Sequence, residues 1–291
     1  PATLEGAPVT SIGTYAFEER EEITSVTFPD TITELGSHSF YRCGALTNLS
    51  LPDGITYIRE YTFTECKNLV HIGLPHSVTN IGEEAFLGCT GLESVVLPAN
   101  LIRIDDYAFE YCSSLSDLNI PDGVLEIGEY AFANCTSLAN LTLHDSIEFI
   151  DNYAFQECTS LTQLFLPVPV IGDYVFDTCT SLGSIAFSSN VTQIGSSAFE
   201  DCSSVTNITF SDGLLSLAGN AFRRCTSLKE VALPDSMTIF KGVFSECTAL
   251  TNAIIPYRTT QLSRPFNRRP PLRTIPLPAS LTTSTRTFPQ R

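Results

Sequence analysis

The sequence contains no apolar run close to the roughly 18 residues that a membrane-spanning helix requires. Its first residues, from Pro1, also lack the charged start and apolar core of a secretory signal peptide. We therefore expect a chain without membrane insertion that is a processed or excised piece.

Basic residues are scarce. There are 16 Lys and Arg against 32 Asp and Glu, which gives a formal net charge of −16 at pH 7. Binding to nucleic acid phosphates or to anionic membranes depends on Lys and Arg, so nucleic acid is not an expected partner. The charge is uneven, because the first 255 residues carry 9 basic and 32 acidic side chains, whereas residues 256–291 carry seven arginines and no acid.

Histidine is rarer still, with four residues that share no common spacing: His38, His71, His76 and His144. No regular pairing of histidine with cysteine is specified, although nucleophilic catalysis needs a base next to the nucleophile. The sequence also lacks a phosphate-binding loop and a metal-binding signature. We expect no catalytic residues, no metal site and no cofactor, and hence a protein that is not an enzyme.

The sequence does contain one segment that recurs many times with small changes. The stretch "IGEEAFLGCTGLESVVLP" from Ile81 recurs as "IDDYAFEYCSSLSDLNIP" from Ile104 and as "IGEYAFANCTSLANLTLH" from Ile127. The spacing of the central Phe is 23 residues eight times, 21 once and 22 twice. Such a period is the signature of a repeat protein whose units stack, and small length changes belong in turns. Twelve repeats are predicted, with their central Phe at Phe17, Phe40, Phe63, Phe86, Phe109, Phe132, Phe155, Phe176, Phe199, Phe222, Phe244 and Phe266.

The apolar positions within one repeat predict its local structure. Leu92, Val95 and Leu97 form an L-x-x-L-x-L pattern, which predicts a short strand with alternate side chains pointing inward. Val78 and Ile81 predict a second short extended segment, and the Phe and Cys three residues apart favour a turn or two of helix. The fold expected is an α/β repeat solenoid, a leucine-rich-repeat-like arc of twelve rungs with a parallel β-sheet on one face and short helical turns on the other.

This unit, I-G-x-x-A-F-x-x-C-x-x-L-x-x-I-x-L-P, resembles the repeat of the BspA-like leucine-rich repeat family over nearly the whole chain. It differs from the commoner leucine-rich repeat, in which Asn or Cys stands three residues after the last leucine, because here Gly54 follows Leu51 by three. Members of the family look like surface adhesion and protein-binding molecules of bacteria and protists. The resemblance therefore implies a binding function, and it names no partner.

The domain organisation follows from the repeats. Residues 1–255 are predicted to form the leucine-rich repeat solenoid, with about eleven repeats, and residues 256–291 an atypical C-terminal capping repeat with a basic tail. In this last repeat Arg269 replaces the Cys, and Pro270 and Pro271 interrupt the pattern. A terminal repeat is expected to be atypical because it caps the stack. The alternative is a basic segment that contacts a partner.

Ten cysteines each follow a repeat Phe by three residues. Their even number would suit a disulfide framework. Stacked repeats, however, place parallel Cβ atoms about 4.8 Å apart, slightly beyond the usual range for a disulfide. We expect instead a buried ladder of small hydrophobic thiols, which also cannot converge on a tetrahedral metal.

Side chains between the inward leucines should line the exposed face of the strands. They are mostly small, polar and uncharged, and solenoids use such extended faces for binding. Phe165 is an exception, and an exposed aromatic often marks a contact. The alternative is a merely solvated surface. The candidate binding residues are Asn48, His71, Asp117, Asn140, Gln163, Phe165 and Asn207.

The sequence gives opposing indications of the cellular compartment of the protein. Five N-x-S/T sequons occur, and glycans at three of them would obstruct the exposed strand face. Unpaired thiols favour an intracellular location, whereas the family resemblance favours the cell surface or secretion, which is the location we expect. The sequons are Asn48, Asn134, Asn140, Asn190 and Asn207.

The function predicted is that of a non-catalytic leucine-rich repeat scaffold for protein–protein recognition through the exposed β-face. The partner is expected to be a protein, with a glycan as the other possibility. The alternative function is that of a cell-surface adhesin that binds matrix or glycans. A contact surface for protein should mix polar and apolar side chains, whereas a surface for sugar should present stacked aromatic rings.

Overall fold

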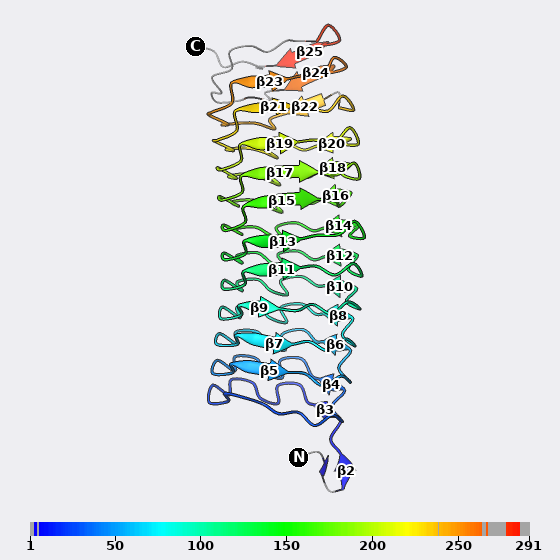
Figure 1. Ribbon diagram of the computed structural model, residues 1–291, viewed down its shortest axis with the longest axis vertical. Coiled ribbons are helices and arrows are strands. Elements are labelled where there is room, and N and C mark those ends of the chain that lie inside the picture. The colour runs from blue at the N-terminus through cyan, green and yellow to red at the C-terminus, as the bar shows by residue number, and fades with distance from the viewer. Residues whose placement is uncertain (1–2, 5, 238, 264–265, 267–277, 286–291) are drawn as a thin grey trace. The chain divides into compact units, whose positions relative to one another are not determined.

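The computed structural model describes residues 3–4, 6–237, 239–263, 266 and 278–285 (Figure 1). Its backbone contacts divide the chain into two units, residues 1–146 (unit 1) and residues 147–291 (unit 2). Both units consist of very short strands joined by turns (Figure 1). In the part of the chain that is described, no helix is long and apolar enough to cross a membrane.

Unit 1 contains two ladders of parallel strands in which neighbours lie one repeat apart. The first ladder, called the strand face, consists of β5 (Asn48–Ser50), β7 (His71–Gly73), β9 (Ser94–Val95), β11 (Asp117–Asn119) and β13 (Asn140–Thr142). The second consists of β6 (Tyr57–Ile58), β8 (Asn80–Ile81), β10 (Arg103–Ile104) and β12 (Glu126–Ile127). The unit begins with an antiparallel pair, β1 (Thr3–Leu4) and β2 (Ala7–Pro8), and a parallel pair, β3 (Ser11–Ile12) and β4 (Glu34–Leu35).

Unit 2 repeats this plan. Its exposed strands are β15 (Gln163–Leu166), β17 (Ser184–Phe187), β19 (Asn207–Thr209), β21 (Glu230–Ala232) and β23 (Asn252–Ile254). A second set comprises β14 (Phe149–Ile150), β16 (Val170–Ile171), β18 (Gln193–Ile194) and β20 (Ser216–Leu217). The last ladder comprises β22 (Ile239–Lys241), β24 (Gln261–Ser263) and β25 (Thr283–Thr285).

The register of the strands confirms the predicted repeat. Ile81 of β8 pairs with Ile58 of β6 and with Ile104 of β10, so each partner is one repeat away. The second extended segment predicted from Val78 and Ile81 is therefore a strand. The 21-residue interval shortens the turn between β15 and β16, residues 167–169, as expected for a small length change.

Part of the predicted terminal segment continues the stack. β24 pairs in parallel with β22 and with β25. The capping role of this segment, and the alternative of a basic segment that contacts a partner, stay predictions. Arg258 is exposed, with its Nε donating to the Tyr257 hydroxyl at 2.9 Å. The other six arginines of 256–291, and Pro270 and Pro271, lie outside the described residues. The boundary at residue 255 stays a prediction.

The core of each unit is a column of stacked phenylalanine rings. Phe63, Phe86 and Phe109 are fully buried, and neighbouring ring centroids lie 5.4 and 4.9 Å apart. In unit 2 the rings of Phe176 and Phe199 stack at 5.3 Å. Since one repeat alone leaves its ring exposed to water, burial of the column requires neighbouring repeats.

The prediction of short helical turns is wrong, because no described residue lies in an α-helix. The Phe turn, defined as the six residues from two before the repeat Phe to three after it, holds a left-handed residue on each side of the ring. Tyr61 (φ 59°) and Glu65 (φ 62°) flank Phe63, and Tyr107 (φ 58°) and Tyr111 (φ 60°) are equivalent in another repeat. Such φ values are incompatible with a right-handed helix.

Backbone hydrogen bonds explain this conformation. In the Phe turn, the N–H groups of Phe63 and Glu65 donate to the carbonyls of Ala85 and Leu87 in the next repeat, at 2.8 and 2.7 Å. The N–H of Cys66 instead donates to the carbonyl of Phe63, three residues back, at 3.2 Å. Alternate donors thus bond between repeats, which a helix would not allow because it bonds all of its donors internally.

Candidate functional site

Four of the predicted binding residues lie in one exposed row of unit 1. Parallel pairing sets Asn48 beside His71, Ser94 beside His71 and Asp117, and Asn140 beside Asp117. All five side chains are exposed. Each of the five residues follows its repeat Phe by eight positions. Because the strands of successive repeats pair side by side, these residues lie next to one another across the sheet.

Hydrogen bonds link neighbours within this row. The Nδ2 of Asn140 donates to Oδ1 of Asp117 at 2.6 Å, and the hydroxyl of Ser116 donates to its Oδ2 at 2.7 Å. These two bonds lower the pKa of Asp117, and the bond from Ser116 has the larger effect. The carboxylate therefore stays ionised. A hydrogen bond of 3.2 Å joins Nδ1 of His71 to the Ser94 hydroxyl.

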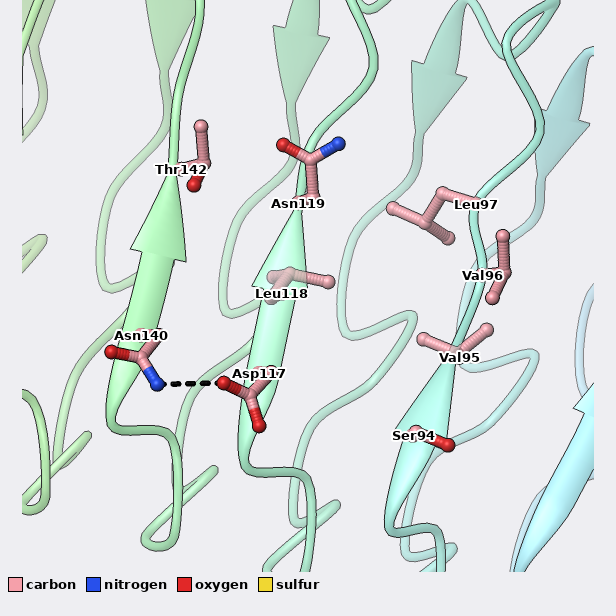
Figure 2. A pocket seen from close by; sticks show the side chains of 9 residues that line it. All are labelled: Ser94, Val95, Val96, Leu97, Asp117, Leu118, Asn119, Asn140 and Thr142. Atoms are coloured by element: carbon pink, nitrogen blue, oxygen red, sulfur yellow. Dashed lines mark hydrogen bonds between the residues drawn. The ribbon is translucent and has the colours of Figure 1, made fainter.

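A depression of about 340 Å³ lies over the same strands (Figure 2). This surface, called the Asp117 groove, combines ionised, amide and hydroxyl groups with aliphatic side chains, and none of the residues lining it is aromatic. Its lining comprises Ser94, Val95, Val96, Leu97, Asp117, Leu118, Asn119, Asn140 and Thr142.

Val96 is the apolar element of the groove, and its side chain is 80% exposed. β9 ends at Val95, one residue earlier than the equivalent ends of β7 and β11, so Val96 lies just beyond the strand (Figure 2). Sequence reasoning placed Val96 on the exposed face without selecting it as a contact. The available signal was its chemistry, because the equivalent positions on β7 and β11 are Gly73 and Asn119.

The other three predicted residues belong to unit 2. Gln163 pairs with Ser184, which pairs with Asn207, so Gln163 and Asn207 share one exposed row. Phe165 stands in the next row beside Ala186 and is 58% exposed. The predicted exposure of this aromatic ring is therefore confirmed.

The cysteines are a structural ladder. All ten are buried and none forms a disulfide, which confirms the predicted use of the thiols. The sulfur of Cys66 lies 3.2 Å from the carbonyl oxygen of Phe40, and that of Cys89 lies 3.1 Å from the carbonyl of Phe63. Burial raises the pKa of these thiols, and raises that of Cys43 to about 11. Little reactive thiolate exists at neutral pH.

A second group of ionisable side chains lies in the Phe turns of unit 1. Burial, together with the Glu84 carboxylate, raises the pKa of Glu110 to about 7. The rings of Tyr107 and Tyr130 also stack here, with centroids 5.1 Å apart. Across the described ranges, no three His, Cys, Asp or Glu side chains are placed to hold a metal ion.

Comparison with known proteins identifies a family that matches this chain. The chain matches the family model described as BspA type leucine rich repeat region in six copies, over residues 4–116, 79–170 and 169–288. No curated protein matches the sequence.

Two solved structures share the fold. A leucine-rich repeat protein from Bacteroides ovatus is similar at 25% identity, over 88% of this chain and 79% of that chain, with a TM-score of 0.58. The pneumococcal vaccine antigen PcpA is similar at 21% identity, over 98% and 77% of the two chains, with a TM-score of 0.59, which shows the fold alone. Because the family model spans nearly the whole sequence, the chain belongs to the BspA-type leucine-rich repeat family.

Proposed function

We propose that this protein is a non-catalytic scaffold that recognises a protein partner through the strand face of unit 1. The Asp117 groove carries this proposal, because it mixes an exposed aliphatic side chain with ionised, amide and hydroxyl groups. Protein contact surfaces have this mixed composition. A sugar-binding surface would instead be expected to present aromatic rings, and the residues lining the groove include none.

Two observations support a binding role over a catalytic one. The thiols, which would be the strongest nucleophiles of the chain, are buried and have raised pKa values. The polar groups of the groove, Asp117 and Asn140, are bonded to each other and do not form an acid, base and nucleophile set.

We also propose the cell-surface or secreted location that family membership suggests. Unpaired cysteines were the argument for an intracellular location. Burial and raised pKa values weaken that argument, because thiol oxidation requires an accessible thiolate. A thiol ladder of this kind can persist in an oxidising environment.

The test uses two matched charge insertions. Val96→Arg places a charge in the groove, whereas Ile102→Arg places the same charge at a 48%-exposed position on the segment before β10. The wild type and both variants are immobilised and exposed to an extract of the native source. We expect the wild type and Ile102→Arg to capture the same proteins and Val96→Arg to lose them. Equal capture by Val96→Arg would contradict recognition through this groove.

A second candidate function, adhesion to matrix or glycans, rests on unit 2. Phe165 presents a 58%-exposed ring beside Gln163 and near the row of Asn207. Exposed aromatic faces stack on sugar rings, and the amides of Gln163 and Asn207 would supply hydrogen bonds. A glycan array probed with the wild type and with Phe165→Ala tests it. Glycan signals that survive in the variant would contradict a role of this ring.

A further inference from the structure

Charge on the strand face of unit 1 has a single sign. The exposed rows lie seven, eight and ten residues after each repeat Phe, and they include the carboxylates of Glu93 and Asp117. No Lys or Arg occurs in these rows of unit 1. The face therefore has no positive group of its own to compensate Asp117.

The rest of unit 1 is also poor in basic side chains. Residues 1–146 contain 21 Asp and Glu against 5 Lys and Arg, a net of −16, whereas residues 147–291 contain 11 of each. Four of the five basic side chains of unit 1 are paired with carboxylates away from the strand face. These pairs are Arg42 with Glu19, Arg59 with Glu34, Lys67 with Glu65, and Arg103 with Glu126.

The geometry of the groove suits an extended chain. Asp117 stands in the row of Ser94 and Asn140, whereas Val96 stands in the row of Asn119 and Thr142. Asp117 and Val96 lie on adjacent strands, so their separation combines about 6.6 Å along the strand with a strand spacing of about 4.8 Å, which gives about 8 Å. Side chains i and i+2 of an extended partner point to the same side about 6.6 Å apart, and the long side chain of a Lys or Arg spans the difference.

We propose that the occupant of the Asp117 groove is an extended protein segment that places a Lys or Arg side chain on Asp117 and an aliphatic side chain two residues away on Val96. The inference rests on the proposed function, and it adds the chemistry of the partner. Charge complementarity favours a cation, since unit 1 carries the whole net negative charge of the chain. The exposed isopropyl group of Val96 provides apolar area next to the charge.

The state of Asp117 supports this choice. Its lowered pKa keeps the carboxylate ionised over the physiological range. Asn140 and Ser116 hold the two carboxylate oxygens in place, so little side-chain entropy remains to be lost when a cation binds. Each carboxylate oxygen keeps lone-pair capacity for a further donor.

The test titrates the isotope-labelled full chain with a synthetic peptide, acetyl-Gly-Lys-Ser-Val-Ser-Lys-Gly-amide, and follows backbone amide shifts by NMR. Two further peptides replace both Lys with Gln or with Glu. We expect the Lys peptide to shift amides of β9, β11 and β13, and the Glu peptide to leave them unchanged. Asp117→Asn should weaken binding of the Lys peptide about two- to fivefold, the range for an exposed ion pair.

The matched control is Glu126→Gln, which removes one exposed carboxylate on β12, outside the strand face, and should leave the affinity unchanged. Equal binding of the Lys and Gln peptides, shifts confined to other strands, or no binding of any peptide would each overturn the proposal. These outcomes are separable from failure of the proposed function. If capture from extract still depends on Val96, the groove recognises proteins by other chemistry.

Discussion

The carbonyl oxygen of Phe40 accepts two hydrogen bonds, one from the backbone N–H of Cys43 in its own repeat and one from the thiol of Cys66 in the next. The distances are 3.1 and 3.2 Å. The cysteine of one repeat therefore binds the phenylalanine of the preceding one. This relationship gives the cysteine column a role beyond filling space, because a buried carbonyl has a second lone pair to satisfy.

The first prediction concerns thiol reactivity. Burial in the native state should keep the thiols unreactive toward a disulfide reagent at pH 8, because little thiolate forms when the pKa is raised. Cys43, with the pKa of about 11, should react before Cys89. In denaturant without reductant, we expect the titration to approach all ten sulfhydryls. A value of only one or two would mean that the cysteines are paired in disulfides.

The second prediction compares two phenylalanines of unit 1. Phe86 stacks on Phe63 and on Phe109, whereas Phe17 is half-buried and stacks on Phe40. Phe86→Ala should lower the free energy of unfolding by about 3 to 5 kcal/mol. Phe17→Ala should cost clearly less, because its cavity is open to water. Urea denaturation of both variants measures the difference. Equal losses would argue against a stability built from contacts between adjacent repeats.

The third prediction tests the left-handed residues of the Phe turn. Tyr111 is 51% exposed and has φ of 60°. Tyr111→Gly should leave the free energy of unfolding unchanged or raise it by up to about 1 kcal/mol, since glycine adopts this φ without steric cost. Tyr111→Val should lower it by about 1 to 2 kcal/mol, because a β-branched residue fits poorly there. In a helical turn the glycine variant would be the less stable of the two.

The fourth prediction concerns pH. The pKa of Glu110 is about 7 in the folded protein because of burial and of Glu84, against about 4.3 when unfolded. The folded state therefore holds this proton over that interval, and the contribution of Glu110 to the free energy of unfolding falls as pH rises from about 4.3 to about 7. Glu110→Gln removes this dependence.

The comparison is between thermal unfolding midpoints of the wild type and Glu110→Gln at pH 4.5 and pH 8. We expect the variant to gain stability relative to the wild type at pH 8. A matched control is Glu93→Gln, which changes an exposed carboxylate of the strand face. If the difference between wild type and Glu110→Gln is the same at both pH values, Glu110 is not held protonated.

Much of the fold was predictable because the repeat overdetermines it. Each inward-facing position occurs once in every repeat. The positions equivalent to Ile81 and Phe86 therefore stand out as consistently apolar, whereas the residues between them vary from repeat to repeat. The helical turns were predicted wrongly for a physical reason. A spacing of three between Phe86 and Cys89 satisfies both a helix and the Phe turn, and only the backbone shows that alternate donors bond to the next repeat.

The candidate site was predictable in part. Asn48, His71, Asp117 and Asn140 occupy the same position in their repeats. Strands of neighbouring repeats pair in register, so residues at the same position lie side by side on the sheet. Val96 was harder to select, because its exposure depends on the early end of β9, and that end has no clear signal in the sequence.

The alternating bonds of the Phe turn also constrain how such a chain can evolve. Duplication of one whole repeat in the gene adds a layer whose donors and acceptors already match those of the layers next to it. Gain or loss of a single codon between Tyr61 and Cys66 would shift the donors of that turn relative to their acceptors in the next repeat. The turn between β15 and β16, by contrast, is short in the 21-residue interval while both strands keep their pairing. Length can therefore change by copying while the exposed rows mutate independently, so that one architecture can acquire many different binding surfaces.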